Sequence, residues 1–153
     1  MQTKMLTTIR DFAKEDKDNY LALSDMFYHS GVVCCSVPQS NFEKTFEKCL
    51  ERNPYVRGLM IEHDGETAGF ALLSFTYSNE AGGMVVLLEE AFVLPDFRGK
   101  GIMRELFVLL EKEYKDMAAR FRLEVTRDNG HAIKIYEKYG YKEIEYMNMI
   151  KDV

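Results

Sequence analysis

The spacing of apolar residues divides the chain into segments with helical and strand-like patterns. Apolar side chains recur at intervals of three and four residues, which predicts one buried helix face over each of residues 16–29, 39–52, 101–117 and 130–139. Runs rich in β-branched and aromatic residues predict strands over residues 3–10, 84–94, 121–126 and 142–150. Two further strands flank Asp64-Gly65, the strongest short hairpin signal in the chain.

The order of these elements predicts an α/β fold. The five consecutive apolar residues from Met84 to Leu88 are typical of a central strand that is covered on both faces. The central run of three strands favours antiparallel neighbours, and the crossovers through the last two helices imply parallel ones. We therefore expect one domain over residues 1–153, with a single mixed sheet and helices on both faces.

The length and the net charge of the chain limit the kinds of function that we expect. A chain of 153 residues can bury roughly two-thirds of its unfolded surface, so a substantial core is available. The formal net charge of -5 argues against a general nucleic-acid binder and is compatible with a cationic substrate.

Cysteine usage and the N-terminal segment predict a cytoplasmic protein. The three cysteines are an odd number, and adjacent Cys34 and Cys35 would form a disulfide only with strain, so we expect reduced thiols. The first ten residues lack the apolar core of a signal peptide, and no run reaches the roughly 18 apolar residues that a membrane helix needs.

The stretch "FRGKGIMREL" has the composition of a phosphate cradle. A strand, a glycine-rich turn and a helix direct free backbone N–H groups and the positive end of the helix dipole at an anion. Gly99 and Gly101 permit positive φ angles, and Arg98, Lys100 and Arg104 add positive charge. The spacing fits neither a Walker loop nor a dinucleotide fingerprint. A tight surface turn with solvated charges is the alternative.

Two separated motifs resemble the GCN5-related N-acetyltransferase family, which transfers an acetyl group from acetyl-CoA to an amine. The first, in "LLEEAFVLPDFRGKGIMREL", matches the family's Arg/Gln-x-x-Gly-x-Gly/Ala at Arg98 and Gly101. The second, "NGHAIKIYEKYGY", matches it at Asn129 and Tyr136. The close resemblance spans residues 84–141. It implies a mixed, mostly antiparallel central sheet of six to seven strands flanked by about four helices.

The resemblance implies acetyl-CoA as co-substrate and no metal. The backbone of Phe92, Val93 and Leu94 would bind the pantetheine arm. The pyrophosphate would lie on the turn formed by Arg98, Gly99, Lys100, Gly101, Ile102, Met103 and Arg104. Met103 departs from the family's preference for Gly or Ala, and its apolar spacing with Phe107 and Leu110 predicts a side chain that points into the core. Asn129 is either a cofactor contact or a helix N-cap.

Acetyl transfer requires a neutral amine, whereas an alkyl amine has a pKa of about 10.4, so deprotonation at neutral pH costs about 4 to 5 kcal/mol. Adjacent Glu89 and Glu90 face opposite sides if the strand is regular, and a bulge would exchange them. The family pattern favours Glu89 as the base, with a solvated carboxylate as the alternative. It implies that Tyr136 protonates the departing thiolate, although a purely structural tyrosine would show the same pattern.

The acceptor is predicted only by class. By resemblance, Phe27, Tyr28 and Glu90 border the acceptor site, and the acidic residues favour a small cationic amine over a peptide or protein amine. A buried structural role is expected for Cys34 and Cys35. Nucleic acid and membranes are not expected partners, and a homodimer is compatible with the sequence. Two alternatives are an acyl-CoA-binding sensor without catalysis and a regulatory domain that binds nucleotide phosphates.

Overall fold

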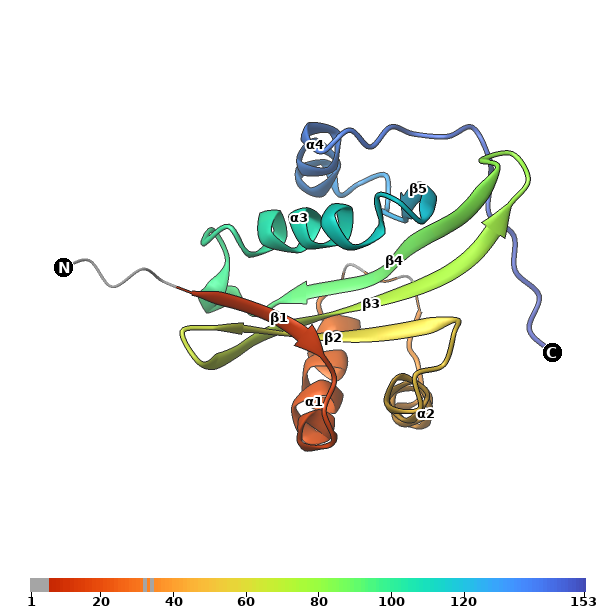
Figure 1. Cartoon of the computed structure of the whole chain (residues 1–153). Helices are drawn as coiled ribbons and strands as arrows, with labels where there is room; N and C mark the ends of the chain where they lie inside the picture. The colour runs from red at the N-terminus through yellow and green to blue at the C-terminus, as the bar shows by residue number, and fades with distance from the viewer. Residues whose placement is uncertain (1–5, 32, 34) are drawn as a thin grey trace.

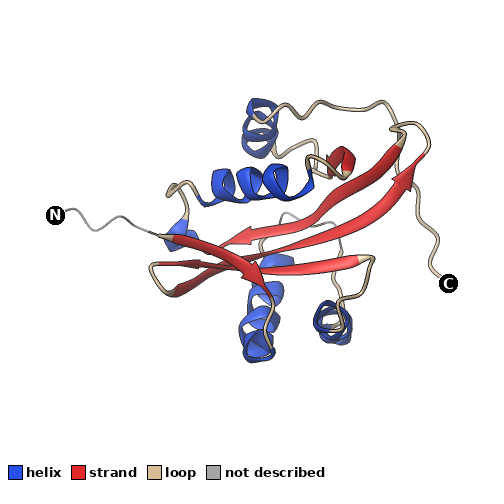
Figure 2. Cartoon of the chain, in the orientation of Figure 1, coloured by secondary structure: helices blue, strands red, loops and turns tan. Residues whose placement is uncertain are grey.

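The computed structural model describes residues 6–31, 33 and 35–153, and its strands form one mixed sheet with helices on both faces (Figures 1 and 2). The strands lie side by side in chain order: β1 (Thr7–Asp11), β2 (Val56–His63), β3 (Glu66–Ser78), β4 (Gly83–Val93) and β5 (Ala118–Leu123). The β1–β2, β2–β3 and β3–β4 pairs are antiparallel, whereas β5 is parallel to β4. The helices are α1 (Lys17–Tyr28), α2 (Gln39–Leu50), α3 (Ile102–Tyr114) and α4 (Gly130–Lys138), with short 3-10 turns η1 (Lys14–Asp16) and η2 (Pro95–Phe97). The predicted fold class is confirmed.

Local turn chemistry explains several element boundaries. Asp64 and Gly65 both have positive φ angles, 51° and 82°, as a two-residue hairpin turn matched to strand twist requires. The predicted hairpin between β2 and β3 is therefore confirmed. At the end of α4, Gly140 has a φ of 86°, and its N–H donates to the Glu137 carbonyl at 3.1 Å. This glycine caps the helix as expected.

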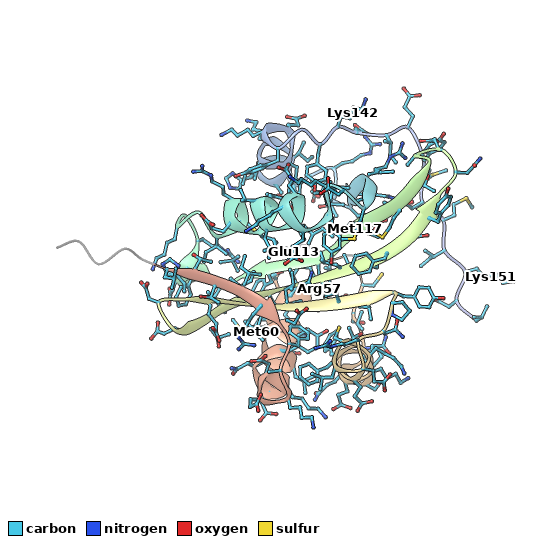
Figure 3. The ribbon with its side chains drawn as sticks, viewed as in Figure 1. Arg57, Met60, Glu113, Met117, Lys142 and Lys151 are labelled. Atoms are coloured by element: carbon cyan, nitrogen blue, oxygen red, sulfur yellow. The ribbon has the colours of Figure 1, made fainter. Side chains whose placement is uncertain are left out.

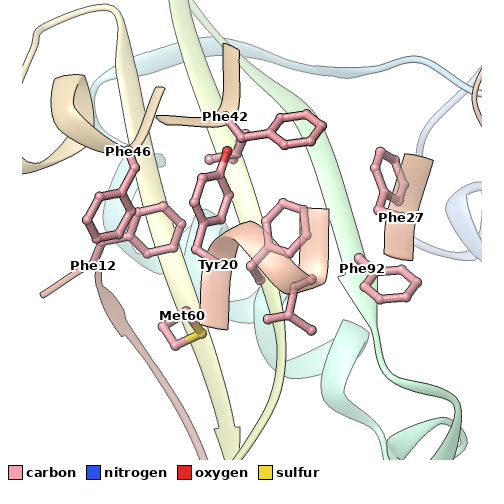
Figure 4. Close-up of a cluster of buried hydrophobic side chains, with 10 residues drawn as sticks. Phe12, Tyr20, Phe27, Phe42, Phe46, Met60 and Phe92 are labelled. Carbon is pink, nitrogen blue, oxygen red and sulfur yellow. The ribbon is translucent and has the colours of Figure 1, made fainter. Parts of the chain in front are cut away.

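An aromatic core fills the space between the sheet and the α1–α2 layer (Figure 4). Tyr20 from α1 and Phe46 from α2 are each only 1% exposed, and their ring centroids lie 5.7 Å apart. The Tyr20 ring also meets Phe70 of β3 edge-on at 5.4 Å. Such large rings bury much apolar area each, so they fix both helices on this face of the sheet.

The opposite face is covered by α3, with α4 lying beyond it (Figure 1). Leu106 and Leu110 of α3 are almost fully buried against Leu59 and Leu73 of the sheet. At the edge of this layer, Arg57 of β2 forms ion pairs with Asp11 and Glu113 and donates a hydrogen bond to Tyr114 (Figure 3). The helix is thus held to the sheet by an apolar stripe and by one branched polar contact.

The predicted last strand over residues 142–150 is wrong. These residues have no ladder partner, so the sheet has five strands among the described residues rather than six to seven. The segment runs past the β3–β4 turn, where the Tyr146 hydroxyl donates to Glu80, and Asn148 donates to Glu124 beside β5 (Figure 1). Alternating apolar residues specify a strand only when a partner edge and a covering layer are present, and Met147 and Met149 are more than 80% exposed.

Candidate active site

The glycine turn joins η2 to α3 and presents a run of free backbone donors. Gly99 and Gly101 have φ angles of 76° and 79°, in the region that favours glycine. The first main-chain bond of the helix runs from the Glu105 N–H to the Gly101 carbonyl at 3.1 Å. Within the described part of the chain, no protein group accepts from the N–H groups of residues 99–104. Free backbone donors and the positive end of a helix are the features that binding an anion requires.

The space in front of this turn is open. A Cβ atom built on Gly99 or Gly101 would meet no heavy atom within 4 Å. The Met103 side chain is half-buried and packs against the core clusters beneath α3 rather than over the turn. The predicted orientation of Met103 is therefore confirmed, and the methionine leaves the N–H groups accessible to an anion.

Beside the turn, no described strand pairs with the outer edge of β4. Pairing between β4 and β5 ends at Leu88 and Leu123, while β4 continues to Val93. The Leu94 N–H donates to the Ala68 carbonyl of the β3 side at 2.8 Å. Because successive residues of a strand direct their backbone groups to opposite edges, those of Val93 face away from β3 and toward the opening. An extended ligand amide can pair there as a neighbouring strand would.

A β-bulge in β4 sets the direction of the two glutamates. Leu72 of β3 pairs with Glu90 and Leu73 pairs with Leu88, so Glu89 has no partner. Leu88 packs with the α3 core, whereas Phe92 packs with the α1–α2 core, although four residues would place them on the same face of a regular strand. The extra residue therefore turns Glu90 and Phe92 toward α1.

Glu90 is the more buried of the two carboxylates. Its Oε2 accepts a hydrogen bond from the Tyr28 hydroxyl at 2.9 Å, and its buried Oε1 has no hydrogen-bond partner among the residues that the structure describes. Burial raises the Glu90 pKa from its usual 4.5 to about 7, the Glu89 charge adds to the rise, and the Tyr28 hydrogen bond opposes it. Burial also raises the Tyr28 pKa, so the phenol stays protonated as the donor. The pair thus holds a carboxyl group that titrates near neutral pH.

Glu89 has a different environment. It is exposed to solvent, and its Oε1 accepts a hydrogen bond from the Ser74 hydroxyl at 2.9 Å. Both carboxylates nevertheless belong to one electrostatic group, because the Glu89 charge acts on Glu90 and on Tyr28. The site is strongly acidic on the face of β4 that meets α1.

The other predicted residues are distributed around this edge. Phe27 is only 9% exposed and packs against Phe92, with ring centroids 5.9 Å apart, so it supports the site from within the core. The Asn129 side chain accepts from the Ala132 N–H at 3.3 Å, which shows the N-cap role that the sequence left open. Cys34 lies outside the described residues, and Cys35 is exposed rather than buried.

Tyr136 lies on the α3 side of the sheet. Its ring packs edge-on against Phe107 at 6.0 Å and lies 6.1 Å from the Tyr141 ring. Burial raises its pKa. The structure thus brings Tyr28 and Glu90 together on one face of β4 and keeps Tyr136 on the other.

The sequence raised one feature of the site only as an alternative and missed another. The bulge was the alternative that would exchange Glu89 and Glu90, and its signal was indirect, the adjacent glutamates between apolar residues that pack on different faces. The second feature is the Arg98 side chain, which turns back toward β4 and donates from Nε to the Val93 carbonyl at 3.0 Å. Neither feature follows from local spacing, because both depend on residues brought together by the fold.

The part of the chain that the structure describes holds neither a membrane-spanning helix nor a metal-binding cluster. No helix there is long and apolar enough to cross a membrane. No group of three or more His, Cys, Asp or Glu side chains is arranged to hold a metal ion among those same residues.

Comparisons with known proteins agree on the kind of domain. The model of the Acetyltransferase (GNAT) family matches residues 20–141. An uncharacterized N-acetyltransferase of Methanocaldococcus jannaschii is 28% identical over 95% of this chain and 67% of its own length. The spermine/spermidine N(1)-acetyltransferase of Bacillus subtilis is 23% identical over 82% of each chain. An aminoglycoside N-acetyltransferase solved with CoA superimposes with a TM-score of 0.78 at 21% identity, covering 99% of this chain and 98% of that one, which shows a shared fold.

Proposed function

Because the chain belongs to the Acetyltransferase (GNAT) family and is an acetyl-CoA-dependent acetyltransferase, we propose that its acceptor is the primary amine of a small cationic molecule. The main support for this proposal is the environment of the Glu90 carboxyl group. Its Oε1 is buried beside the open edge of β4 with no partner among residues 6–31, 33 and 35–153, and its pKa of about 7 suits a group that accepts a proton at neutral pH.

The described residues fit acetyl-CoA. Bound acetyl-CoA supplies an acyl thioester that an amine can attack. The free N–H groups of residues 99–104, with Lys100 and Arg104, provide donors and positive charge for its pyrophosphate. Phe92, Val93 and Leu94 form the strand end beside the opening, where Val93 offers its N–H to the pantetheine arm. Asn129 begins α4 near β5 and stays a proposed cofactor contact as well as an N-cap.

Glu90 and Glu89 have different roles in removing the proton from the amine. The geometry supports Glu90 as the group that takes a proton from the incoming ammonium, directly or through water, because its orphaned Oε1 needs a donor. Glu89, which the sequence favoured as the base, is solvent-exposed beside it and can attract the cation and pass the proton to bulk water. Tyr28 holds Glu90 in place through Oε2 and leaves Oε1 for the substrate.

Tyr136 is the proposed acid for the departing thiolate. Burial raises its pKa, so the phenol retains the proton that it must deliver. Tyr136 lies on the α3 side of the sheet, whereas Glu90 lies on the other side. This arrangement supports a transfer in which the amine approaches from the Glu90 side of the β4 edge and the thiol leaves on the Tyr136 side.

The acidic surroundings support a cationic acceptor. Two adjacent carboxylates lie on the α1 side of β4, and the whole chain has a net charge of -5. The name of the Bacillus subtilis relative specifies spermine and spermidine, and that of the CoA-bound structural neighbour specifies aminoglycosides. These names support small polycationic amines over peptide or protein amines.

A panel of acceptors tests the proposal. Release of free CoA thiol is measured with spermidine, an aminoglycoside, a peptide with a free N-terminal amine and an N-terminally blocked lysine peptide. We expect the small polycations to give kcat/KM values at least about tenfold above those of the peptides, since a second charge can interact with the paired carboxylates. A preference for either peptide would refute the acceptor class.

A further inference from the structure

The Arg98 side chain contacts β4 rather than extending into solvent in front of the turn. Its Nε–H donates to the Val93 carbonyl at 3.0 Å. The guanidinium carbon lies 5.9 Å from the centroid of the Phe92 ring, within range of a cation–π contact. Arg98 therefore contacts two consecutive residues at the strand end, one through its carbonyl and one through its ring.

The strand end needs such support because it is paired on one side only. The last β4–β5 pair is Leu88 with Leu123, so the backbone groups of Val93 face the opening without a neighbouring strand. The Phe92 ring packs against the Phe27 ring, and the Phe27 ring packs against Tyr28. The Tyr28 hydroxyl in turn donates to Glu90. Arg98 thus lies at one end of a continuous row of contacts that leads to the acceptor carboxylate.

The turn offers donors for an anion besides the Arg98 side chain. Six consecutive residues, 99–104, provide N–H groups that no protein group accepts from within the described residues. The backbone N–H of Arg98 is not one of them, because it donates to the Pro95 carbonyl at 3.2 Å. Lys100 has a separate orientation, with its Nζ 5.1 Å from the Phe97 ring.

We propose that Arg98 is a positioning residue, whose Nε–H holds the open end of β4 in the extended form that pairs with the pantetheine arm. Its charge toward phosphate is then secondary to this hydrogen bond. The inference rests on the proposed function for its kinetic consequence, but the hydrogen bond to Val93 belongs to the ligand-free protein and can be tested without turnover.

A matched pair of variants separates the donor from the charge. In Arg98→Gln the side-chain nitrogen is bonded to Cδ, as Nε is in arginine, so the donor is kept and the charge is lost. In Arg98→Met the length is similar and both donor and charge are absent. Each variant is assayed with acetyl-CoA and with S-acetylpantetheine, which has no pyrophosphate.

With S-acetylpantetheine, we expect Arg98→Met to lower kcat/KM by about tenfold, the scale of one hydrogen bond, and Arg98→Gln to stay within about threefold of wild type. The second measurement is amide hydrogen exchange at Leu94, whose N–H is bonded to the Ala68 carbonyl. In the ligand-free protein it should exchange about tenfold faster in Arg98→Met and remain near wild type in Arg98→Gln.

The opposite pattern overturns the inference. If both variants weaken only the use of acetyl-CoA, and Leu94 exchange is unchanged in both, Arg98 acts through its charge on the phosphates. If no amine is acetylated by the wild-type protein, the proposed function fails, while the exchange measurement still decides the role of Arg98.

Discussion

The Tyr28 hydroxyl donates a hydrogen bond of 2.9 Å to Oε2 of Glu90, and the other oxygen of that carboxylate, Oε1, is buried with no partner in the described part of the chain. One residue comes from the end of α1 and the other from the bulge of β4. An unsatisfied buried oxygen costs free energy unless a donor arrives, and an ammonium group is such a donor. This relationship connects the fold to the proposed chemistry.

Replacing Glu90 by Gln removes the proton acceptor without changing the shape of the side chain. We expect kcat to fall by about 10² to 10⁴, the usual contribution of general base catalysis. Glu89→Gln is the matched control, because it removes the same charge from the adjacent, exposed position. We expect it to lower kcat by less than about tenfold. Steady-state thiol release measures both, and a larger loss in Glu89→Gln would restore Glu89 as the base.

Glu90→Gln should also change how the free energy of unfolding depends on pH. Burial raises the Glu90 pKa in the folded protein from 4.5 to about 7, so the folded state binds more protons than the unfolded state between these values. The contribution of Glu90 to the free energy of unfolding of the wild type is therefore present at low pH and is lost as the pH rises through 7. We expect Glu90→Gln to be more stable than wild type at pH 8 by about 1 to 3 kcal/mol, with no gain near pH 4. Urea unfolding at both pH values measures the difference, and an equal effect at both would contradict the burial of this charge.

Tyr28→Phe removes the hydroxyl that stabilises the charged form of Glu90. Because this hydrogen bond lowers the Glu90 pKa, its loss should raise that pKa further. The ascending limb of kcat/KM against pH should move to higher pH by about 0.5 to 1 unit. A shift to lower pH, or none, would show that the hydroxyl does not act on the catalytic group.

Gly101→Ala tests the anion cradle. At a φ of 79° an alanine is strained, although its Cβ would meet no atom within 4 Å. Gly82→Ala, in the β3–β4 turn, is a matched control with a φ of 75° and the same open surroundings. We expect both variants to lose about 1 kcal/mol of stability, while only Gly101→Ala weakens CoA binding, by about tenfold. Calorimetric titration with CoA measures the affinity, and equal affinities in the two variants would refute the assigned cradle.

Sequence reasoning succeeded where the signal is local. The glycine turn, its free donors and the inward Met103 follow from residues within a few positions of one another, and Asp64-Gly65 specifies its hairpin by backbone preference alone. These features depend little on what the rest of the chain does.

Features that depend on a partner strand were not decided by the sequence, which offered the bulge only as an alternative. The bulge at Glu89 exists because β3 pairs with β4 in two registers, so the direction of Glu90 is set by Leu72 and Leu73. Residues 142–150 have strand-like alternation, yet no edge pairs with them among the described residues. In both cases the deciding contacts lie far away along the chain.

The measurement that tests the central claim most directly is the pH dependence of kcat/KM for a small cationic amine, compared between wild type and Glu90→Gln. If Glu90 accepts the proton, wild-type kcat/KM rises with an apparent pKa near 7, as the buried carboxyl loses its proton, and this rise is absent in Glu90→Gln. A rise with the same apparent pKa in both proteins would show that Glu90 is not the proton acceptor.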